Sequence, residues 1–85
     1  MNVRKFDKTM SLRDFQGLIK ETMSKDGIKA PIDEALARAA WNHMMNVGKW
    51  EHGLPKRVFF DDHQPSIEYD DGLWWHYKLS SGTWY

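Results

Sequence analysis

The sequence predicts an α+β fold, with two N-terminal helices packed on a small C-terminal antiparallel β-sheet of three to four strands. Apolar residues recur at helical spacing through residues 11–48, whereas residues 57–85 form short alternating runs separated by turn residues. The chain has 85 residues, of which 14% are aromatic, enough for one core. We therefore expect a single domain over 1–85, with an N-terminal arm (1–10), a helical half (11–48) and a β half (57–85).

The first helix is predicted to start after Ser11. A Ser followed three residues later by an acid, here Asp14, is typical of a capping box. Gly27 suits the left-handed position after a helix, so the helix should end just before it. The apolar stripe of this helix comprises Leu12, Phe15, Leu18, Ile19 and Met23.

The second helix is predicted to have Pro31 in its first turn and to stop at Gly48. Asp33 and Glu34 would complement the positive end of its dipole. Its apolar row comprises Ile32, Leu36, Ala40, Met44 and Val47, widened by Trp41 and Met45.

Strands are predicted at residues 57–60, where Val58 and Phe60 share a face, and 66–69, separated by a loop over residues 61–65. A three-residue turn at Asp70-Asp71-Gly72 would then place Ile67 and Tyr69 on one face with Leu73, Trp75, Tyr77 and Leu79, whereas a two-residue turn would put polar residues there. We choose the three-residue turn. It leaves Ser66, Glu68, Trp74, His76 and Lys78 facing away from the helices.

Two tryptophans have alternative placements. After the turn at residues 80–82, a three-residue loop would put Trp84 on the outward face, whereas a two-residue loop would pack it opposite Leu79 in the core. Trp74 could be open to solvent or covered by Phe6 from the N-terminal arm.

The net charge is zero, but the charges are unevenly distributed along the chain. Residues 1–57 hold eleven basic and seven acidic residues, a net charge of +4, and residues 58–85 hold one basic and five acidic, a net charge of −4. The pattern permits an acidic C-terminal lobe or simply acidic turns and a solvated strand face. The five acids are Asp61, Asp62, Glu68, Asp70 and Asp71.

Two kinds of binding surface can be read from these residues. Exposed Trp beside charge is typical of protein interfaces, so we expect a protein partner, with a homodimer also possible. The predicted partner-binding residues are Trp74, His76, Lys78, Trp84, Asp61, Asp62 and Glu68. The alternative is a DNA- or RNA-binding regulator of the helix-turn-helix-with-wing type, using Arg38, Asn42, Asn46 and Lys20.

No pattern of catalytic residues, metal ligands or cofactor binding is present in the sequence. The four histidines lack the spacing of a ligand set, the paired acids fall at predicted turns, and the glycines form no phosphate loop. We therefore predict a non-enzymatic accessory or inhibitor protein that needs no cofactor or metal. Without cysteine, a signal peptide or a membrane-spanning run, the sequence indicates the cytoplasm; its small size is associated with phage and mobile-element proteins.

Overall fold

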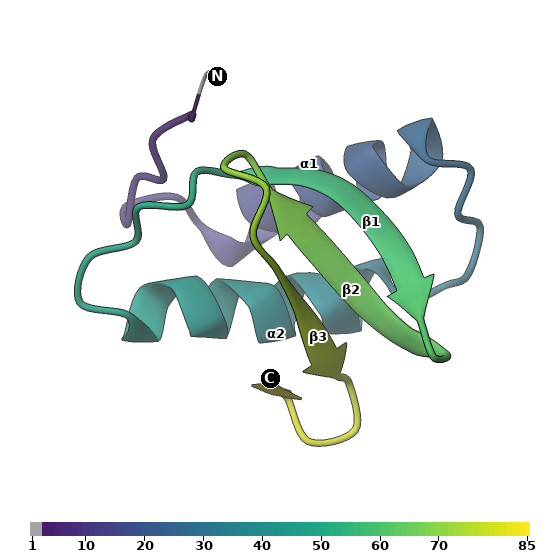
Figure 1. Ribbon diagram of the computed structural model, residues 1–85. Helices are drawn as coiled ribbons and strands as arrows, with labels where there is room; N and C mark the ends of the chain where they lie inside the picture. The colour runs from purple at the N-terminus through teal and green to yellow at the C-terminus, as the bar shows by residue number, and fades with distance from the viewer. Residues whose placement is uncertain (1–2) are drawn as a thin grey trace.

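A computed structural model describes residues 3–85 and contains two helices followed by four antiparallel strands (Figure 1). The elements are α1 (Leu12–Lys25), α2 (Asp33–Asn46), β1 (Pro55–Asp61), β2 (Gln64–Tyr69), β3 (Trp74–Lys78) and β4 (Thr83–Trp84). The strands are arranged in the order β1-β2-β3-β4. This is the α+β arrangement that the sequence predicts; the first two residues of the predicted arm lie outside the described residues.

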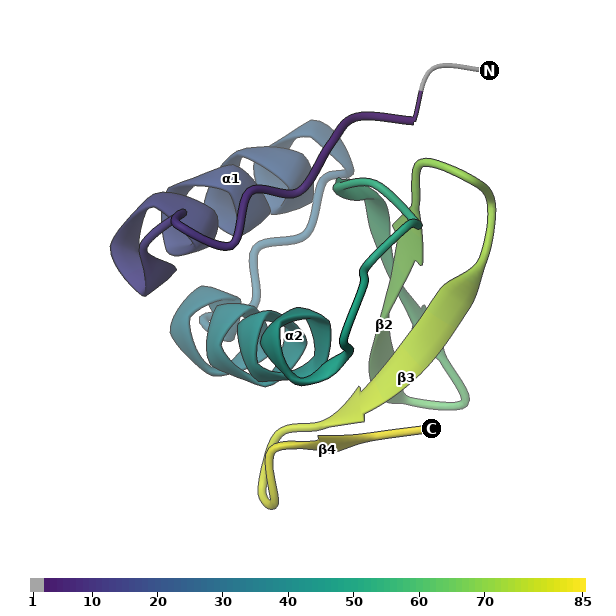
Figure 2. The same cartoon turned by 90° about the vertical axis from the view of Figure 1, so that its left-hand side faces the viewer.

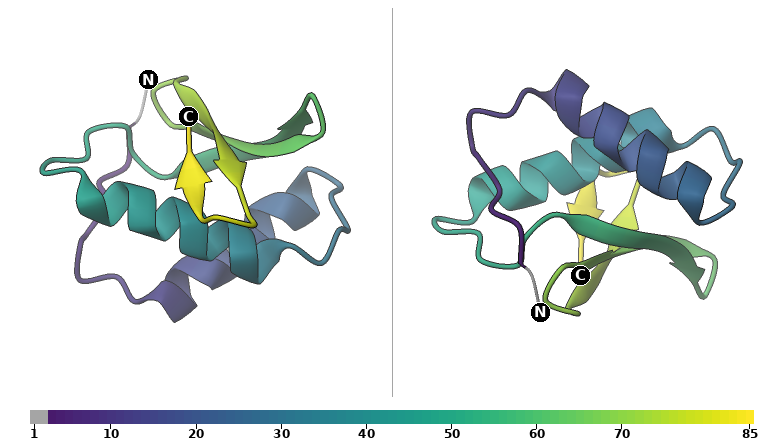
Figure 3. Two further views of the ribbon diagram at one scale, coloured as in Figure 1. Left: turned by 90° about the horizontal axis from the view of Figure 1, so that it is seen from below. Right: turned by 90° about the horizontal axis from the view of Figure 1, so that it is seen from above.

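The molecule has two layers, with both helices on one side of the sheet (Figure 2). Helix α1 packs against β1, and α2 packs against β3 and β4. The N-terminal segment runs beside the connection between α2 and β1 (Figure 3), where Lys8 Nζ donates hydrogen bonds to the carbonyls of Val47 and Gly48. The opposite side of the sheet faces away from the helices. Within the described residues, neither helix is long and apolar enough to span a membrane.

The helix ends mostly follow the capping residues that the sequence contains. Ser11 Oγ accepts a hydrogen bond from the Asp14 N–H at 3.1 Å, and α1 ends before Gly27, which has a positive φ of 74°. The prediction for Pro31 is wrong: α2 begins at Asp33 with Ile32 as its N-cap, so the proline precedes the first turn.

The predicted register between β2 and β3 is confirmed. Ile67 pairs with Trp75, and the chain turns through three residues ending at Gly72, which has a φ of 90°. Two burial predictions were wrong. Leu73 takes no part in the core and is 51% exposed. Ser66 is buried on the outward side, because its two cross-strand neighbours there are aromatic.

The hairpin between β1 and β2 is tighter than the sequence suggested. Asp61 pairs with Gln64, so only Asp62 and His63 form the turn, and both have positive φ values, 50° and 66°. This is the geometry of a two-residue hairpin turn usually made by Asn or Gly. The predicted loop over residues 61–65 was therefore too long, and Pro65 lies within β2.

The core lies between the helices and the inner side of the sheet. Phe6 is buried there against Phe15, with ring centroids 6.4 Å apart, so it does not cover Trp74. Phe60 shares a face of β1 with Val58, as the sequence predicts, but it lies at the end of the strand and is 48% exposed. The fully buried large side chains include Phe15, Ile19, Leu36, Met44, Val58, Ile67, Tyr69 and Tyr77.

Candidate functional site

The side of the sheet that faces away from the helices, here called the outer face, carries three rows of side chains. The members of the upper and middle rows are cross-strand neighbours. Lys78 belongs to the lower row because it lies two residues after His76 and so points to the same face of β3. The upper row is Arg57, Glu68 and Trp74; the middle row is Phe59, Ser66, His76 and Tyr85; the lower row is Asp61, Gln64 and Lys78.

Aromatic rings on the outer face touch one another from β1 to the residue after β4. Trp74 packs edge-on against Phe59, with centroids 5.1 Å apart, and lies 5.0 Å from the ring of His76. His76 in turn stacks on Tyr85 at 4.4 Å with an interplanar angle of 6°. The guanidinium of Arg57 lies 4.2 Å over the Phe59 ring, which adds a cation–π contact. The outer face is therefore a continuous ring-packed surface.

Two of these rings remain open to solvent. Trp74 is 42% exposed and Tyr85 is 55% exposed. In so small a domain, large apolar side chains are usually buried, because few other side chains are available to build the core. The prediction that Trp74 faces outward is thus confirmed.

Trp84 does not belong to the outer face. The last turn uses four residues, so Lys78 pairs with Thr83 and Trp84 pairs with Tyr77, a register that neither sequence-based alternative included. Trp84 faces the helices and stacks on the ring of His43 at 4.6 Å. The outward position that the three-residue alternative gave to Trp84 is taken by Tyr85.

Glu68 in the upper row is neutralised within the chain. The register of β1 shifts between Pro55 and Arg57, and this irregularity lets two consecutive cations reach one carboxylate. Lys56 Nζ lies 3.1 Å from one Glu68 oxygen and Arg57 Nη2 lies 2.9 Å from the other. Burial alone would raise the pKa of Glu68, but these two partners outweigh it and lower the pKa below its ordinary value.

The carboxylates at the lower end of the outer face differ in their surroundings. Asp61 Oδ2 lies 2.8 Å from His76 Nε2, which joins the lower row to the middle row. Asp62 occupies the exposed tip of the β1–β2 hairpin, and no ion pair within residues 3–85 involves it. Lys78 lies over the ring of Tyr85, with Nζ 5.3 Å from the centroid.

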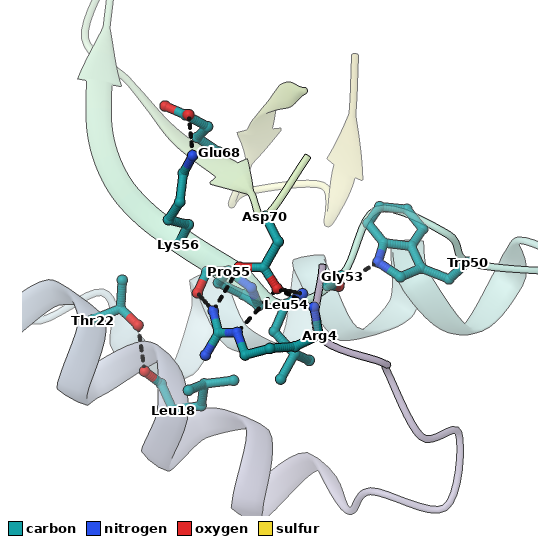
Figure 4. A network of polar contacts seen from close by, with 10 residues as sticks. All are labelled: Arg4, Leu18, Thr22, Trp50, Gly53, Leu54, Pro55, Lys56, Glu68 and Asp70. Atoms are coloured by element: carbon teal, nitrogen blue, oxygen red, sulfur yellow. Dashed lines mark hydrogen bonds and ion pairs between the residues drawn. The ribbon is translucent and has the colours of Figure 1, made fainter. Parts of the chain in front are cut away.

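Asp70, one of the five acids in residues 58–85, is a buried structural group (Figure 4). Its carboxylate accepts bonds from Arg4 Nη2 at 2.9 Å, Arg4 Nε at 3.0 Å and the backbone N–H groups of Arg4 and Leu54. Burial raises the pKa of Asp70, but these donors more than compensate and lower it overall. Arg4 also donates to the Pro55 carbonyl at 3.0 Å, so the pair ties the N-terminal segment to the start of β1.

Asp71 is likewise paired within the chain. Its Oδ2 lies 2.6 Å from His52 Nδ1, and its other oxygen accepts from the Leu73 N–H at 3.1 Å. Four of the five acids in residues 58–85 thus have a basic partner, and four of these partners, Arg4, His52, Lys56 and Arg57, come from the first 57 residues. Glu68 and Asp70 are thus balanced by cations from earlier in the chain and add no free negative charge to this part of the molecule.

A second aromatic cluster lies on the inner side of the sheet around His43. Its Nδ1 is 2.8 Å from the hydroxyl of Tyr77, which is 2.6 Å from the hydroxyl of Tyr69. Burial, with a smaller contribution from His52, lowers the pKa of His43 to about 4, so the ring is neutral at pH 7. Burial also raises the pKa of both tyrosines. The chain of neutral groups satisfies its own hydrogen bonds inside the core.

The residues of the nucleic-acid alternative are not gathered into one free surface. Arg38 is paired with Glu34 at 3.3 Å, one helical turn away, and Asn46 donates to the Asn42 carbonyl at 2.6 Å. Arg38 and Asn42 line a shallow groove between α2 and the β3–β4 turn, whereas Lys20 lines a separate hollow beside the α1–α2 connection.

Four residues of the outer face, Arg57, Phe59, Gln64 and Tyr85, were not predicted from the sequence. Strict alternation along β1 could have identified the first two, since they lie on either side of Val58 and so point to the face opposite that of Val58 and Phe60. Tyr85 required the length of the last turn, which the sequence does not specify. In the described part of the chain, no group of histidines and acids has the geometry to hold a metal ion. No protein-family model, curated protein or solved structure that was compared with the chain matches it.

Proposed function

We propose that this chain is a non-catalytic accessory or inhibitor protein that binds another protein through the outer face. The observation that carries the proposal is the uninterrupted ring contact from Phe59 to Tyr85 on a surface that neither helix covers. Trp74 lies within this run of rings, and Trp is the residue type most often found at binding hot spots. Contacts with the neighbouring rings already hold the Trp74 side chain in place. A rigid exposed Trp loses little conformational entropy on binding.

The same contacts favour a protein partner over a single-stranded nucleic acid. Bases stack on open ring faces, and phosphates need available cations. On the outer face, however, His76 and Tyr85 stack on each other, and Arg57 is engaged by Glu68 and the Phe59 ring. The outer face therefore consists of an apolar area bordered by paired charges. Protein–protein interfaces have a similar composition, with an apolar centre and a polar rim.

A display library of random peptides, panned on the immobilised chain, supplies binding probes without requiring the natural partner. Selected peptides are then measured against Trp74→Ala and against Phe60→Ala, which removes an equally exposed ring that is not on the outer face. We expect Trp74→Ala to weaken binding at least about tenfold and Phe60→Ala to leave it unchanged. Peptides that bind both variants like the unmodified chain would refute the proposal.

A further inference from the structure

The charges of the outer face are arranged as a dipole along the strands. The upper row with the adjacent Lys56 has two cations and one carboxylate. The lower row with the adjacent Asp62 has two carboxylates and one cation. The middle row contains no lysine, arginine or acid and is mostly aromatic. One end of the face is thus positive and the other negative, with apolar rings between them.

A surface with this arrangement is complementary to itself. In a two-fold symmetric interface the same patch is used by both copies, so it must complement its own rotated image. Rotation about an axis that lies across the strands brings the upper row of one copy onto the lower row of the other and the middle rows onto each other. Aligned packing of two sheets through such faces is a common arrangement.

We propose that a second copy of this chain covers the outer face in this orientation when no other partner is bound, an inference that rests on the proposed function of that face. Arg57 of one copy then lies opposite Asp61 of the second, and Trp74 lies opposite Lys78 of the second. Arg57 keeps its contact with Glu68, so the first is an attraction between opposite charges added to the existing pair, and the second is a cation–π contact. Each occurs twice because the interface is symmetric.

Two other ways of joining a second copy are less favourable. A two-fold axis that runs along β2 would place Glu68 against Glu68 of the other copy. Pairing of the β1 edges is opposed by Asp26, whose carboxylate accepts a hydrogen bond from the Val58 N–H at 2.9 Å and so occupies an edge donor. A charged side chain at a sheet edge is a common protection against strand addition.

The outer face is narrow, so the dimer should be weak. Its three rows span four strands, the last of only two residues. Interfaces below about 1,200 Å² of total buried area are typical of transient association. We expect an equilibrium between monomer and dimer that is populated at high protein concentration and that another partner can displace.

The test reverses one charge at a time and measures self-association of each variant by sedimentation equilibrium. Circular dichroism verifies that every variant is folded. Arg57→Glu and Asp61→Lys should each weaken self-association about tenfold, because like charges then face each other twice. An equimolar mixture of the two variants should recover dimer, since both cross-copy pairs in the heterodimer are again opposite in sign. The other face-to-face orientation predicts no recovery, because there the Asp61→Lys substitution sets a second cation against Lys78 of the other copy.

A chain that stays monomeric to millimolar concentration, or a mixture that shows no recovery, would overturn the inference. Either result leaves the proposed function standing, because the peptide experiment on Trp74→Ala measures binding to a different partner. Conversely, self-association with no Trp74-dependent peptide would remove the proposed function and retain the dimer.

Discussion

His76 and Tyr85 stack nearly parallel on the outer face, with ring centroids 4.4 Å apart, and their backbones exchange both hydrogen bonds at 3.0 and 3.1 Å. This pairing continues the sheet beyond the two residues of β4. It also sets the alternation that turns Trp84 inward and Tyr85 outward. The two last aromatic residues of the chain therefore have opposite roles, one in the core and one on the proposed binding surface.

Trp74 and Trp84 should differ sharply in their effect on stability. We expect Trp84→Ala to lower the free energy of unfolding by about 2–3 kcal/mol, because it removes a ring packed on the buried His43. Trp74→Ala should cost within about 1 kcal/mol, since its ring is 42% exposed. Urea denaturation of the two variants measures both values. Equal losses would mean that the last turn has a different register.

Gly53 should tolerate substitution less well than Gly72. Both have a positive φ, 83° and 90°, so alanine is strained at either position. A Cβ at Gly53 would also lie 2.5 Å from Asp70 Oδ2, whereas a Cβ at Gly72 would have no neighbour within 4 Å. We expect Gly53→Ala to destabilise the fold by about 2 kcal/mol more than Gly72→Ala in thermal or urea unfolding. Equal effects would mean that the Arg4–Asp70 cluster is not rigid.

Asp70 should contribute to acid unfolding. Its pKa in the folded chain is lowered below the ordinary value of 3.8, so its stabilising contribution is complete above that value and is lost as the pH falls through the folded pKa. Asp70→Asn should therefore be less stable than the unmodified chain at neutral pH, and the difference should shrink below pH 3.8. Asp62→Asn, at the exposed hairpin tip, is the control for removing one carboxylate and should not lower stability at neutral pH, because Asn suits the positive φ of this turn. A constant difference for Asp70→Asn would contradict the assignment.

His43 should affect the stability of the fold in a higher pH range than Asp70 does. Because burial lowers its pKa from 6.5 to about 4, the unfolded chain takes up this proton first as the pH falls. Its contribution to stability is thus present above pH 6.5 and is lost as the pH falls toward 4, by up to about 3 kcal/mol. Titration of the imidazole by NMR gives the folded pKa directly. A value near 6.5 would show that water reaches the ring.

A role in nucleic-acid binding has a simple test. Phosphate binding is strongest at low salt, so fluorescence anisotropy with labelled duplex and single-stranded DNA in low-salt buffer gives the alternative its best chance. We expect no binding there, because Arg38 and Asn46 are already engaged within α2. Binding that weakens steeply with added salt and is lost in Arg38→Ala would support the alternative.

The sequence predicts the parts of this fold that depend on local patterns. The turn at Gly72 is an example, because only one of the two possible registers puts Ile67 and Tyr69 on the apolar face. The tight turn at Asp62-His63 was missed because neither residue is a glycine, although both adopt positive φ. The last turn was also missed, since the sequence leaves its length undetermined.

The distribution of charge along the sequence did not predict the ion pairs of the fold, for a different reason. Arg4 and Asp70 are 66 residues apart, and their ion pair forms only when the N-terminal segment passes the start of β1. The net charge of a segment does not reveal such a contact, so the sequence could not decide between an acidic lobe and acidic turn residues. The same limit applies to Lys56 and Arg57, which neutralise Glu68 across the sheet.

Hydroxyl-radical footprinting, read by mass spectrometry of the oxidised side chains, tests the role of the outer face most directly. The chain is labelled at low concentration, alone and with a saturating peptide from the display selection. We expect oxidation of Trp74 and Tyr85 to fall when the peptide is bound, while Phe60, which has a similar exposed fraction, stays unchanged. Protection of Phe60 or of the groove at Arg38, with Trp74 still fully oxidised, would contradict the account.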